Sequence, residues 1–210
     1  MLVQGQVGPI STTQSQAQGT NPVIRLGNMG DQIITGLHGA YYEANYRRTL
    51  FNGGVVGQVT TAGLATTYTG LCLSNPINST VNLVLVQAGY GFIVAFAAGS
   101  LIGLMTGYNS GTNVTHTTPV TPRSQYFGVG ASGTGLLDSS ATLPTAPTVN
   151  TIFGSGLTGA ITTVPHIGPT FIELKGSIIL PPGAYCAFYT STVSGAAAGG
   201  FSFTWEEVPL

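Results

Sequence analysis

The sequence predicts an all-β protein, a jelly-roll-like antiparallel β-sandwich with an extended N-terminal arm. Three observations predict this fold. Among the 210 residues, 31 Gly and 12 Pro divide the chain into short segments. Several of these segments alternate apolar and polar residues with a period of two, which is typical of half-buried strands. We find no amphipathic helix longer than two turns, and many short strands without helices favour a sandwich of jelly-roll type.

Residues 1–22 predict the arm, because they are rich in Gln, Ser, Thr and Gly, carry no charged side chain and show no hydrophobic period. A single sandwich domain follows over residues 23–210. Two alternatives stay open for the arm: a terminal tail without fixed structure, or a segment that orders against a neighbouring subunit. In the second case its glutamines are candidate interface residues, namely Gln14, Gln16 and Gln18.

The first strand is predicted at residues 42–50, where Tyr42, Ala44, Tyr46 and Leu50 alternate with polar residues. A helix is the alternative, because Glu43 and Arg47 would then form an i,i+4 ion pair. Aromatic residues and Thr favour the strand.

The chain then continues to Arg123 without a charged side chain, and its most apolar part is Leu83–Met105. As a helix these residues would be about 34 Å long, enough to cross a bilayer. However, no Lys or Arg flanks the segment, and polar and small residues interrupt it, namely Gln87, Gly89 and Gly91. We therefore predict two buried strands, 81–86 and 90–94, separated by a glycine turn, and no membrane partner.

Residues 106–169 are dominated by Thr, Gly, Ser and Pro, and predict a long loop region. Loops of that length are uncommon inside compact domains. Two interpretations stay open: short strands joined by long loops, or a surface for contact.

The C-terminal end gives the clearest pattern. Residues 171–180 predict a strand whose core face carries Ile172, Leu174, Gly176, Ile178 and Leu180. The sequence Pro181-Pro182-Gly183 predicts a turn, a second strand follows over residues 184–190, and the last strand places Phe201, Phe203 and Trp205 on one face.

The charge pattern excludes some classes of partner. Only 5% of the residues are charged, against about 25% in ordinary soluble domains, and the net charge is −1. Five Lys and Arg are too few to neutralise a run of phosphates, so nucleic acid is not an expected partner. A monomer with so little charge would be poorly protected from self-association, which indicates a permanently assembled protein.

We find no pattern that predicts catalysis or a cofactor. Residues 128–133 match GxGxxG, but no buried strand precedes them and no acidic residue follows at the spacing that dinucleotide binding needs. Cys72 and Cys186 are predicted as buried thiols, with a disulfide or a metal pair as alternatives. His38, His116 and His166 are predicted to be structural, although a triad assembled from distant positions stays open.

Three segments together resemble a known family: residues 37–44 (LHGAYYEA), residues 70–79 (GLCLSNPINS), and the ending with 180–185 (LPPGAY) and 201–209 (FSFTWEEVP). This combination is similar to the jelly-roll cement (decoration) proteins of tailed bacteriophages. The resemblance implies a homotrimer on the outside of the virion head that clamps subunits of a major capsid protein, after synthesis in the host cytoplasm. It implies no catalytic residue and no cofactor.

Within this hypothesis we expect Tyr41, Tyr42, Tyr46, Arg47 and Arg48 to be interface anchors, because Tyr and Arg are enriched at the energetic centres of interfaces. The alternative is that these tyrosines belong to the core. A tail-fibre or host-recognition module is the alternative function, in which the loops of residues 106–165 would bind surface glycans.

Overall fold

A computed structural model describes residues 39–61, 63–92, 96, 98–128, 132–156, 170–193 and 199–210, together with two short strands near the N-terminus. The chain divides into two compact units, Met1–Ala40 and Tyr41–Leu210. In the first unit, β1 (Gly5–Gln6) pairs in parallel with β2 (Ile24–Arg25). The predicted interface glutamines of the arm, Gln14, Gln16 and Gln18, lie outside the described residues. The second unit begins at Tyr41, later than the domain boundary at residue 23 that the sequence suggests.

The described part of the second unit contains one short helix and twelve strands. They are α1 (Tyr42–Tyr46), β3 (Leu50–Gln58), β4 (Thr67–Ser74), β5 (Val81–Phe92), β6 (Ser100–Tyr108), β7 (Thr115–His116), β8 (Pro119–Val120), β9 (Arg123–Ser124), β10 (Leu136–Thr142), β11 (Thr148–Gly156), β12 (Thr170–Leu180), β13 (Ala184–Thr190) and β14 (Gly199–Pro209). The all-β class predicted from the sequence is confirmed.

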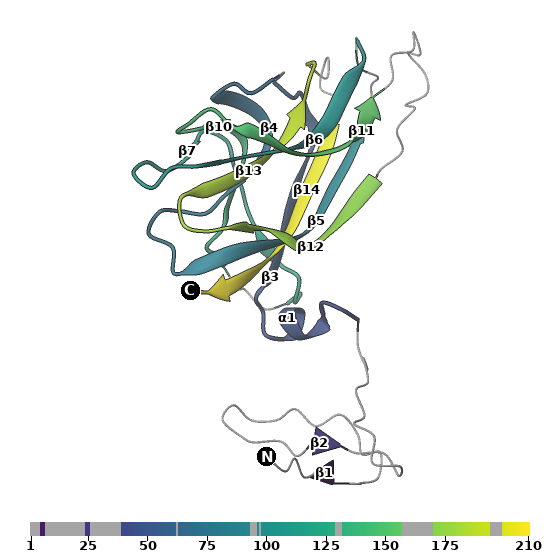
Figure 1. The fold of residues 1–210 in the computed structure, drawn as a ribbon, viewed down its shortest axis with the longest axis vertical. Coiled ribbons are helices and arrows are strands. Elements are labelled where there is room, and N and C mark those ends of the chain that lie inside the picture. Colours follow the sequence, from purple (N-terminus) through teal and green to yellow (C-terminus); the bar gives the residue numbers. More distant parts are fainter. Residues whose placement is uncertain are drawn as a thin grey trace. The chain divides into compact units, whose positions relative to one another are not determined.

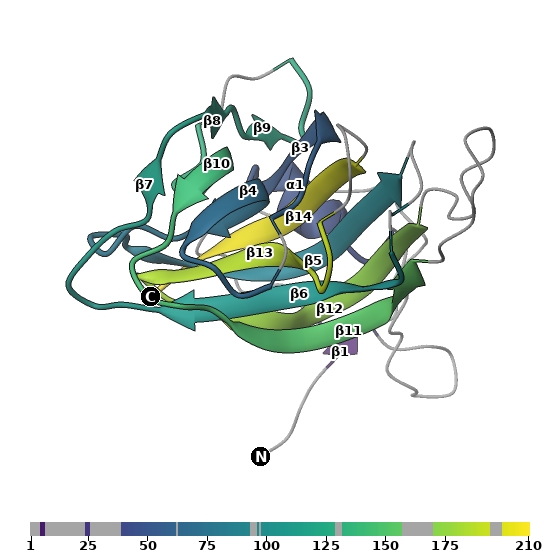
Figure 2. The same ribbon diagram turned by 90° about the horizontal axis from the view of Figure 1, so that it is seen from above.

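The strands form two antiparallel sheets that pack as a β-sandwich (Figures 1 and 2). The five-stranded sheet has the order β12-β5-β14-β3-β9. The seven-stranded sheet has the order β11-β6-β13-β4-β10-β7, and its seventh strand, β8, also pairs with β10. Eight long strands, which we call the jelly-roll frame, make up most of the sandwich. Four of them form β3-β14-β5-β12 in one sheet, and the other four form β4-β13-β6-β11 in the other. Successive frame strands alternate between the sheets, except that β6 and β11 are paired in the same sheet, and this order is that of the two Greek keys of a jelly roll.

The Thr/Gly/Pro-rich middle of the chain contains strands as well as loops. Strands β7, β8, β9 and β10 form an insertion between β6 and β11 that extends both sheets. Strand β9 adds to β3 in one sheet, and β10 adds to β4 in the other. Within residues 106–156, the interpretation as short strands joined by loops therefore describes the chain better than one long loop. Residues 157–169 lie outside the described part.

The core between the sheets is built mainly from large apolar side chains. Phe203 and Trp205 of β14 have no exposed surface, and they lie in one cluster with Phe51 of β3 and Phe188 of β13. The predictions for the C-terminal end are confirmed. The alternate residues of β12 face inward or outward as expected, and Gly183 in the turn before β13 has φ of +86°.

A second, smaller core lies on the outer face of the seven-stranded sheet. Cys72, Met105, Tyr185 and Ala187 from three neighbouring strands are buried there, under residues that include Val114 and Leu143. Both cysteines are buried free thiols, as predicted. Burial raises the pKa of both thiols, so they remain protonated and unreactive.

The predicted strand over residues 42–50 is wrong in its first half, because α1 covers Tyr42–Tyr46 and the strand begins at Leu50. The helical alternative explains these residues. Arg47 Nε lies 2.8 Å from Glu43 Oε1, and the rings of Tyr42 and Tyr46 stack with centroids 6.0 Å apart. Both pairs use the i,i+4 spacing, which places two side chains on one face of a helix. The alternation of tyrosines was therefore a misleading signal for a strand.

The segment Leu83–Met105 contributes to two strands, β5 and β6, and not to one helix. Strand β5 continues through Gly89, so the predicted glycine turn is wrong. At Gly89 a Cβ atom would lie 2.6 Å from the Ser202 hydroxyl oxygen on β14, so a larger residue there would require this hydroxyl to rotate away. Within the described residues, none of the helices has the length and apolar character that a membrane span requires.

Candidate functional site

The first candidate site is an exposed surface of aromatic and arginine residues at α1 and the end of β9. We call it the aromatic–arginine patch and define it by Tyr42, Tyr46, Arg48, Tyr126 and Phe127. The four aromatic side chains are between 38% and 81% exposed, with Phe127 the most exposed of them. Exposed large aromatic groups that lie together mark interaction sites more often than isolated ones do.

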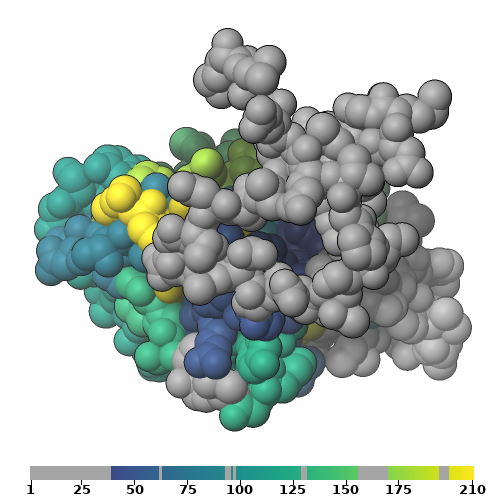
Figure 3. All heavy atoms as spheres, turned by 90° about the horizontal axis from the view of Figure 1, so that it is seen from below, coloured from purple at the N-terminus to yellow at the C-terminus, as the bar shows by residue number. Residues whose placement is uncertain are grey.

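Two contacts hold the two parts of the patch together. The guanidinium of Arg48 lies over the ring of Tyr126, 5.5 Å from its centroid, and the Gln125 N–H donates to the Leu50 carbonyl oxygen. Arg48 follows the helix with φ of +63°, a conformation that turns the chain from α1 into β3. In Figure 3, the blue surface of the first segments of the sandwich lies beside the green surface of segments from the inserted region between β6 and β11.

The five predicted interface anchors all lie on or next to α1, but they differ in their exposure and in the residues that they contact. Tyr42 and Tyr46 are exposed on α1 and are not core residues. Arg47 pairs with Glu43, whereas Arg48 contacts Tyr126. The Tyr41 hydroxyl donates to Glu173 on β12, and desolvation and this carboxylate raise the pKa of Tyr41. Tyr126 and Phe127 were not among the predicted interface anchors, because only the fold places the end of β9 beside α1.

The second candidate site is a polar network on the outer face of the seven-stranded sheet. Ser74 Oγ at the end of β4 lies 3.1 Å from His116 Nε2, and His116 Nδ1 lies 3.3 Å from Asp138 Oδ2 on β10. The second contact does not meet hydrogen-bond geometry. These residue types in this order are those of a Ser–His–Asp triad. No carboxylate lies near His116 in the sequence, so only the pairing of β7 with β10 reveals the neighbour.

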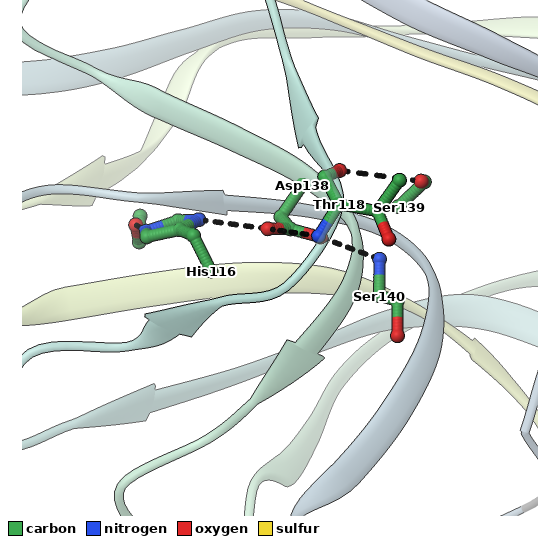
Figure 4. A network of polar contacts seen from close by, with 6 residues as sticks. His116, Thr118, Asp138, Ser139 and Ser140 are labelled. Atoms are coloured by element: carbon green, nitrogen blue, oxygen red, sulfur yellow. Dashed lines mark hydrogen bonds and ion pairs between the residues drawn. The ribbon is translucent and has the colours of Figure 1, made fainter.

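Asp138 is the centre of this network and has no exposed surface. Its carboxylate accepts the backbone N–H groups of Thr118 and Ser140, and His116 also faces it (Figure 4). Strand β10 has a bulge at this position, between the pairing of Asp138 and that of Ser140. Burial lowers the pKa of His116, and the Asp138 carboxylate opposes this shift. The imidazole is therefore neutral near pH 7 and can accept the Ser74 hydroxyl.

The geometry favours a structural role for this network over nucleophilic catalysis. Ser74 is only 3% exposed, which leaves little room for a substrate beside its hydroxyl. An oxyanion site needs N–H donors that point to the reacting carbonyl. The nearest backbone candidate, the N–H of Asn75, already donates to the Ala184 carbonyl oxygen over 2.9 Å. What the network does is fasten β7 and Thr118 to β10.

A buried glutamate holds the other end of the inserted segment. Glu207 Oε1 accepts the backbone N–H groups of Thr134 and Gly135 and lies 3.3 Å from the indole nitrogen of Trp205. In the described part of the chain, no group of three His, Cys, Asp or Glu side chains is placed to hold a metal ion. His38 and His166, and residues 129–131 of the GxGxxG match at 128–133, lie outside the described residues.

Comparison of the chain with protein-family models, with curated proteins and with solved structures finds no match. Functional inference therefore depends on the patch, the polar network and the distribution of charge in the sandwich itself.

Proposed function

We propose that this chain is a non-enzymatic structural protein of a phage virion. It acts as a cement protein that binds the outside of the head as a homotrimer and stabilises contacts between capsomers of the major capsid protein. The observation that carries the proposal is the aromatic–arginine patch, in which Phe127 is 81% exposed beside the Arg48–Tyr126 contact. Aromatic and arginine side chains supply most of the binding free energy at protein interfaces.

The mechanism is linkage between binding and shell stability. A protein that binds only the assembled shell stabilises it by about 2.7 kcal/mol per site when its free concentration is a hundred times Kd. Repeated over the many equivalent sites of a shell, this free energy opposes the pressure of packaged DNA. The jelly-roll frame and the near absence of charge, with a net charge of −1, support a protein that works in an assembly.

The test uses undecorated heads assembled from the major capsid protein of the same virus. Purified chain is incubated with the heads, the heads are sedimented, and the number of bound copies is measured as a function of concentration. The double variant R48G/F127S should bind at least tenfold more weakly, because it removes the central cation and the most exposed ring. Glycine is chosen at position 48 because it accommodates the positive φ.

The matched control is Val56→Ser, which removes an 82% exposed side chain of β3 outside the patch and should bind like the wild type. Wild-type chain that does not bind heads at all would overturn the cement function. A double variant that binds as tightly as the wild type would overturn the role of the patch.

A glycan-binding module of a tail fibre is the second candidate, and a specific observation favours it. Tyr108, Tyr126 and Phe127 all lie in the region where sugar contacts were expected, and each is at least 38% exposed. Flat exposed aromatic rings are suitable for stacking on sugars. A carbohydrate array probed with purified chain separates the candidates, since a cement protein should give no signal on it.

A further inference from the structure

The outer face of the seven-stranded sheet is only half covered. On one half, the smaller core buries Met105 and Tyr185. On the other half, Leu101 of β6 and Val149 and Ile152 of β11 are 46%, 42% and 44% exposed. We call this second half the bare face and define it by Leu101, Val149 and Ile152.

The strand register places these three side chains on one surface. Ile152 pairs with Gly103, Val149 with Met105 and Ser155 with Leu101. Residues that pair directly across a sheet point to the same face, and Ile102 and Leu104 already point into the core between the sheets. The bare face is therefore a continuous aliphatic strip along β6 and β11.

Charge is distributed unevenly between the two sheets. Strands β6, β11 and β13 contain no charged residue, and the only charged residue that occurs in the seven-stranded sheet is the buried Asp138. In the described sandwich, the exposed charges lie on α1, on Arg47 and Arg48 directly after it, and on strands of the five-stranded sheet.

The two neighbouring edge strands differ in the same way. Strand β12 carries Glu173 and Lys175 and a bulge in which Lys175 and Gly176 have positive φ, which are features that protect natural sheet edges from unwanted pairing. Strand β11 also departs from regular register, but it carries neither a charge nor a proline. The edge strand next to the bare face, β11, therefore lacks the charges that protect β12 from pairing with another chain.

A groove lies at the neighbouring edge of the sandwich, where β11 faces β12. It has a volume of about 700 Å³ and is lined by residues of β6, β11 and β12, which include Tyr108, Asn150 and Ile179. None of its lining residues is charged, and none belongs to the bare face, which is on the other side of β11. A partner that covers the bare face and extends around the edge of β11 could place side chains in the groove without leaving a buried charge unpaired.

We propose that the bare face, with this groove, is the surface through which copies of this chain contact one another in the homotrimer. The inference rests on the homotrimer in the proposed function and locates its interface. A second copy is the occupant that the charges favour, since it brings the same near-neutral surface and a net charge of only −1, so that copies do not repel each other. The aromatic–arginine patch, on other elements, is left available for the shell.

The test measures molar mass by light scattering on a sizing column. Three chains of 21.4 kDa give about 64 kDa for the wild type. Ile152→Lys and Leu101→Lys, made separately, should shift the mass to that of one chain, because a lysine at a closed interface leaves an unpaired charge. The milder variant Ile152→Thr keeps a β-branched side chain and should weaken the trimer without affecting the strand.

The matched control is Val56→Lys, which places the same charge on an exposed position of β3 in the other sheet and should remain a trimer. Circular dichroism and thermal melting verify that each variant is folded. Trimers of normal mass in both folded lysine variants would overturn the interface and leave the cement function intact. A wild-type mass of one chain would overturn the interface and the homotrimer, while head binding by that monomer would still support a cement protein.

Discussion

Asp138 and Glu207 are the carboxyl groups that the described sandwich buries, and both hold the inserted segment. Asp138 accepts N–H groups at Thr118 and Ser140, and Glu207 accepts them at Thr134 and Gly135. A buried carboxylate is unfavourable unless such donors replace its water. Glu207, on β14, thus attaches the inserted segment to the jelly-roll frame, whereas Asp138 holds the strands and loops of that segment together.

Asp138→Asn should lower the free energy of unfolding by about 1–3 kcal/mol. The amide has no negative charge, and its NH₂ group takes the place of Oδ2, where this donor would face the Thr118 N–H, which is itself a donor. Urea denaturation measures the difference. Glu206→Gln is the control, because the same chemical change at a half-buried position of β14 should cost less than about 0.5 kcal/mol. Equal losses in the two variants would contradict this account.

The protein should lose stability as the pH falls below about 6.5. Burial lowers the pKa of His116 in the folded state. As the pH falls, the unfolded chain therefore becomes protonated at His116 before the folded chain does, and acid stabilises the unfolded state relative to the folded state. The contribution is fully present above the unfolded pKa and decreases as the pH falls toward the folded pKa, with a slope of at most about 1.4 kcal/mol per pH unit. Urea denaturation between pH 8 and pH 5 should show a smaller pH dependence in His116→Gln. An identical slope in both proteins would show that His116 does not titrate in this range.

Pairing of β6 with β11 requires a residue without a side chain at position 103. A Cβ atom on Gly103 would overlap the Thr151 carbonyl oxygen and lie 3.0 Å from Ile152 Cα, and backbone atoms cannot move aside as flexible side chains can. At Gly154, in the same strand pair, a Cβ atom would meet nothing within 4 Å. The two glycines therefore serve as a test and its matched control within one element.

Gly103→Ala should destabilise the protein by about 2–4 kcal/mol, whereas Gly154→Ala should change its stability by less than about 1 kcal/mol. Thermal or urea unfolding of the two variants measures both effects. Full tolerance of Gly103→Ala would mean that β11 can move away from β6 at little cost.

The elements also show what sequence reasoning can reach. Strands β12, β13 and β14 were predictable because alternation, a Pro-Pro-Gly turn and large aromatics all indicate the same structure. The helix α1 was missed because Tyr42, Ala44 and Tyr46 satisfy a period of two, while the helical pairs Glu43–Arg47 and Tyr42–Tyr46 satisfy a spacing of four equally well. The Ser74–His116–Asp138 network could not be predicted, since its members meet only through pairing of β4, β7 and β10.

At the scale of the whole molecule, charged residues are distributed unevenly between the two sheets of the sandwich. The exposed charges of the described part lie on or directly after α1 and on the five-stranded sheet, and the bare face and the neighbouring groove carry none. Two surfaces of different chemistry are what a protein needs when it contacts its own copies and a different partner at the same time. A single uniform surface could not distinguish the two kinds of contact.

The proposed homotrimer should therefore be insensitive to salt. Between 0.05 M and 1 M NaCl the molar mass should stay at that of three chains, because screening acts on charges and the proposed interface contains none. Light scattering at the two salt concentrations measures this directly. Dissociation at high salt would show that ion pairs, and not the bare face, join the copies.

The position of β14 in the five-stranded sheet has a consequence for how the chain is made. Strand β14 is the last of the described strands to be synthesised, yet it lies between β3 and β5 and pairs with both along most of its length. Until residues 199–209 have left the ribosome, that sheet lacks its middle strand, and Phe201, Phe203 and Trp205 are missing from the core. The sandwich therefore cannot form progressively as its strands emerge, and a chain that stops before β14 cannot close it.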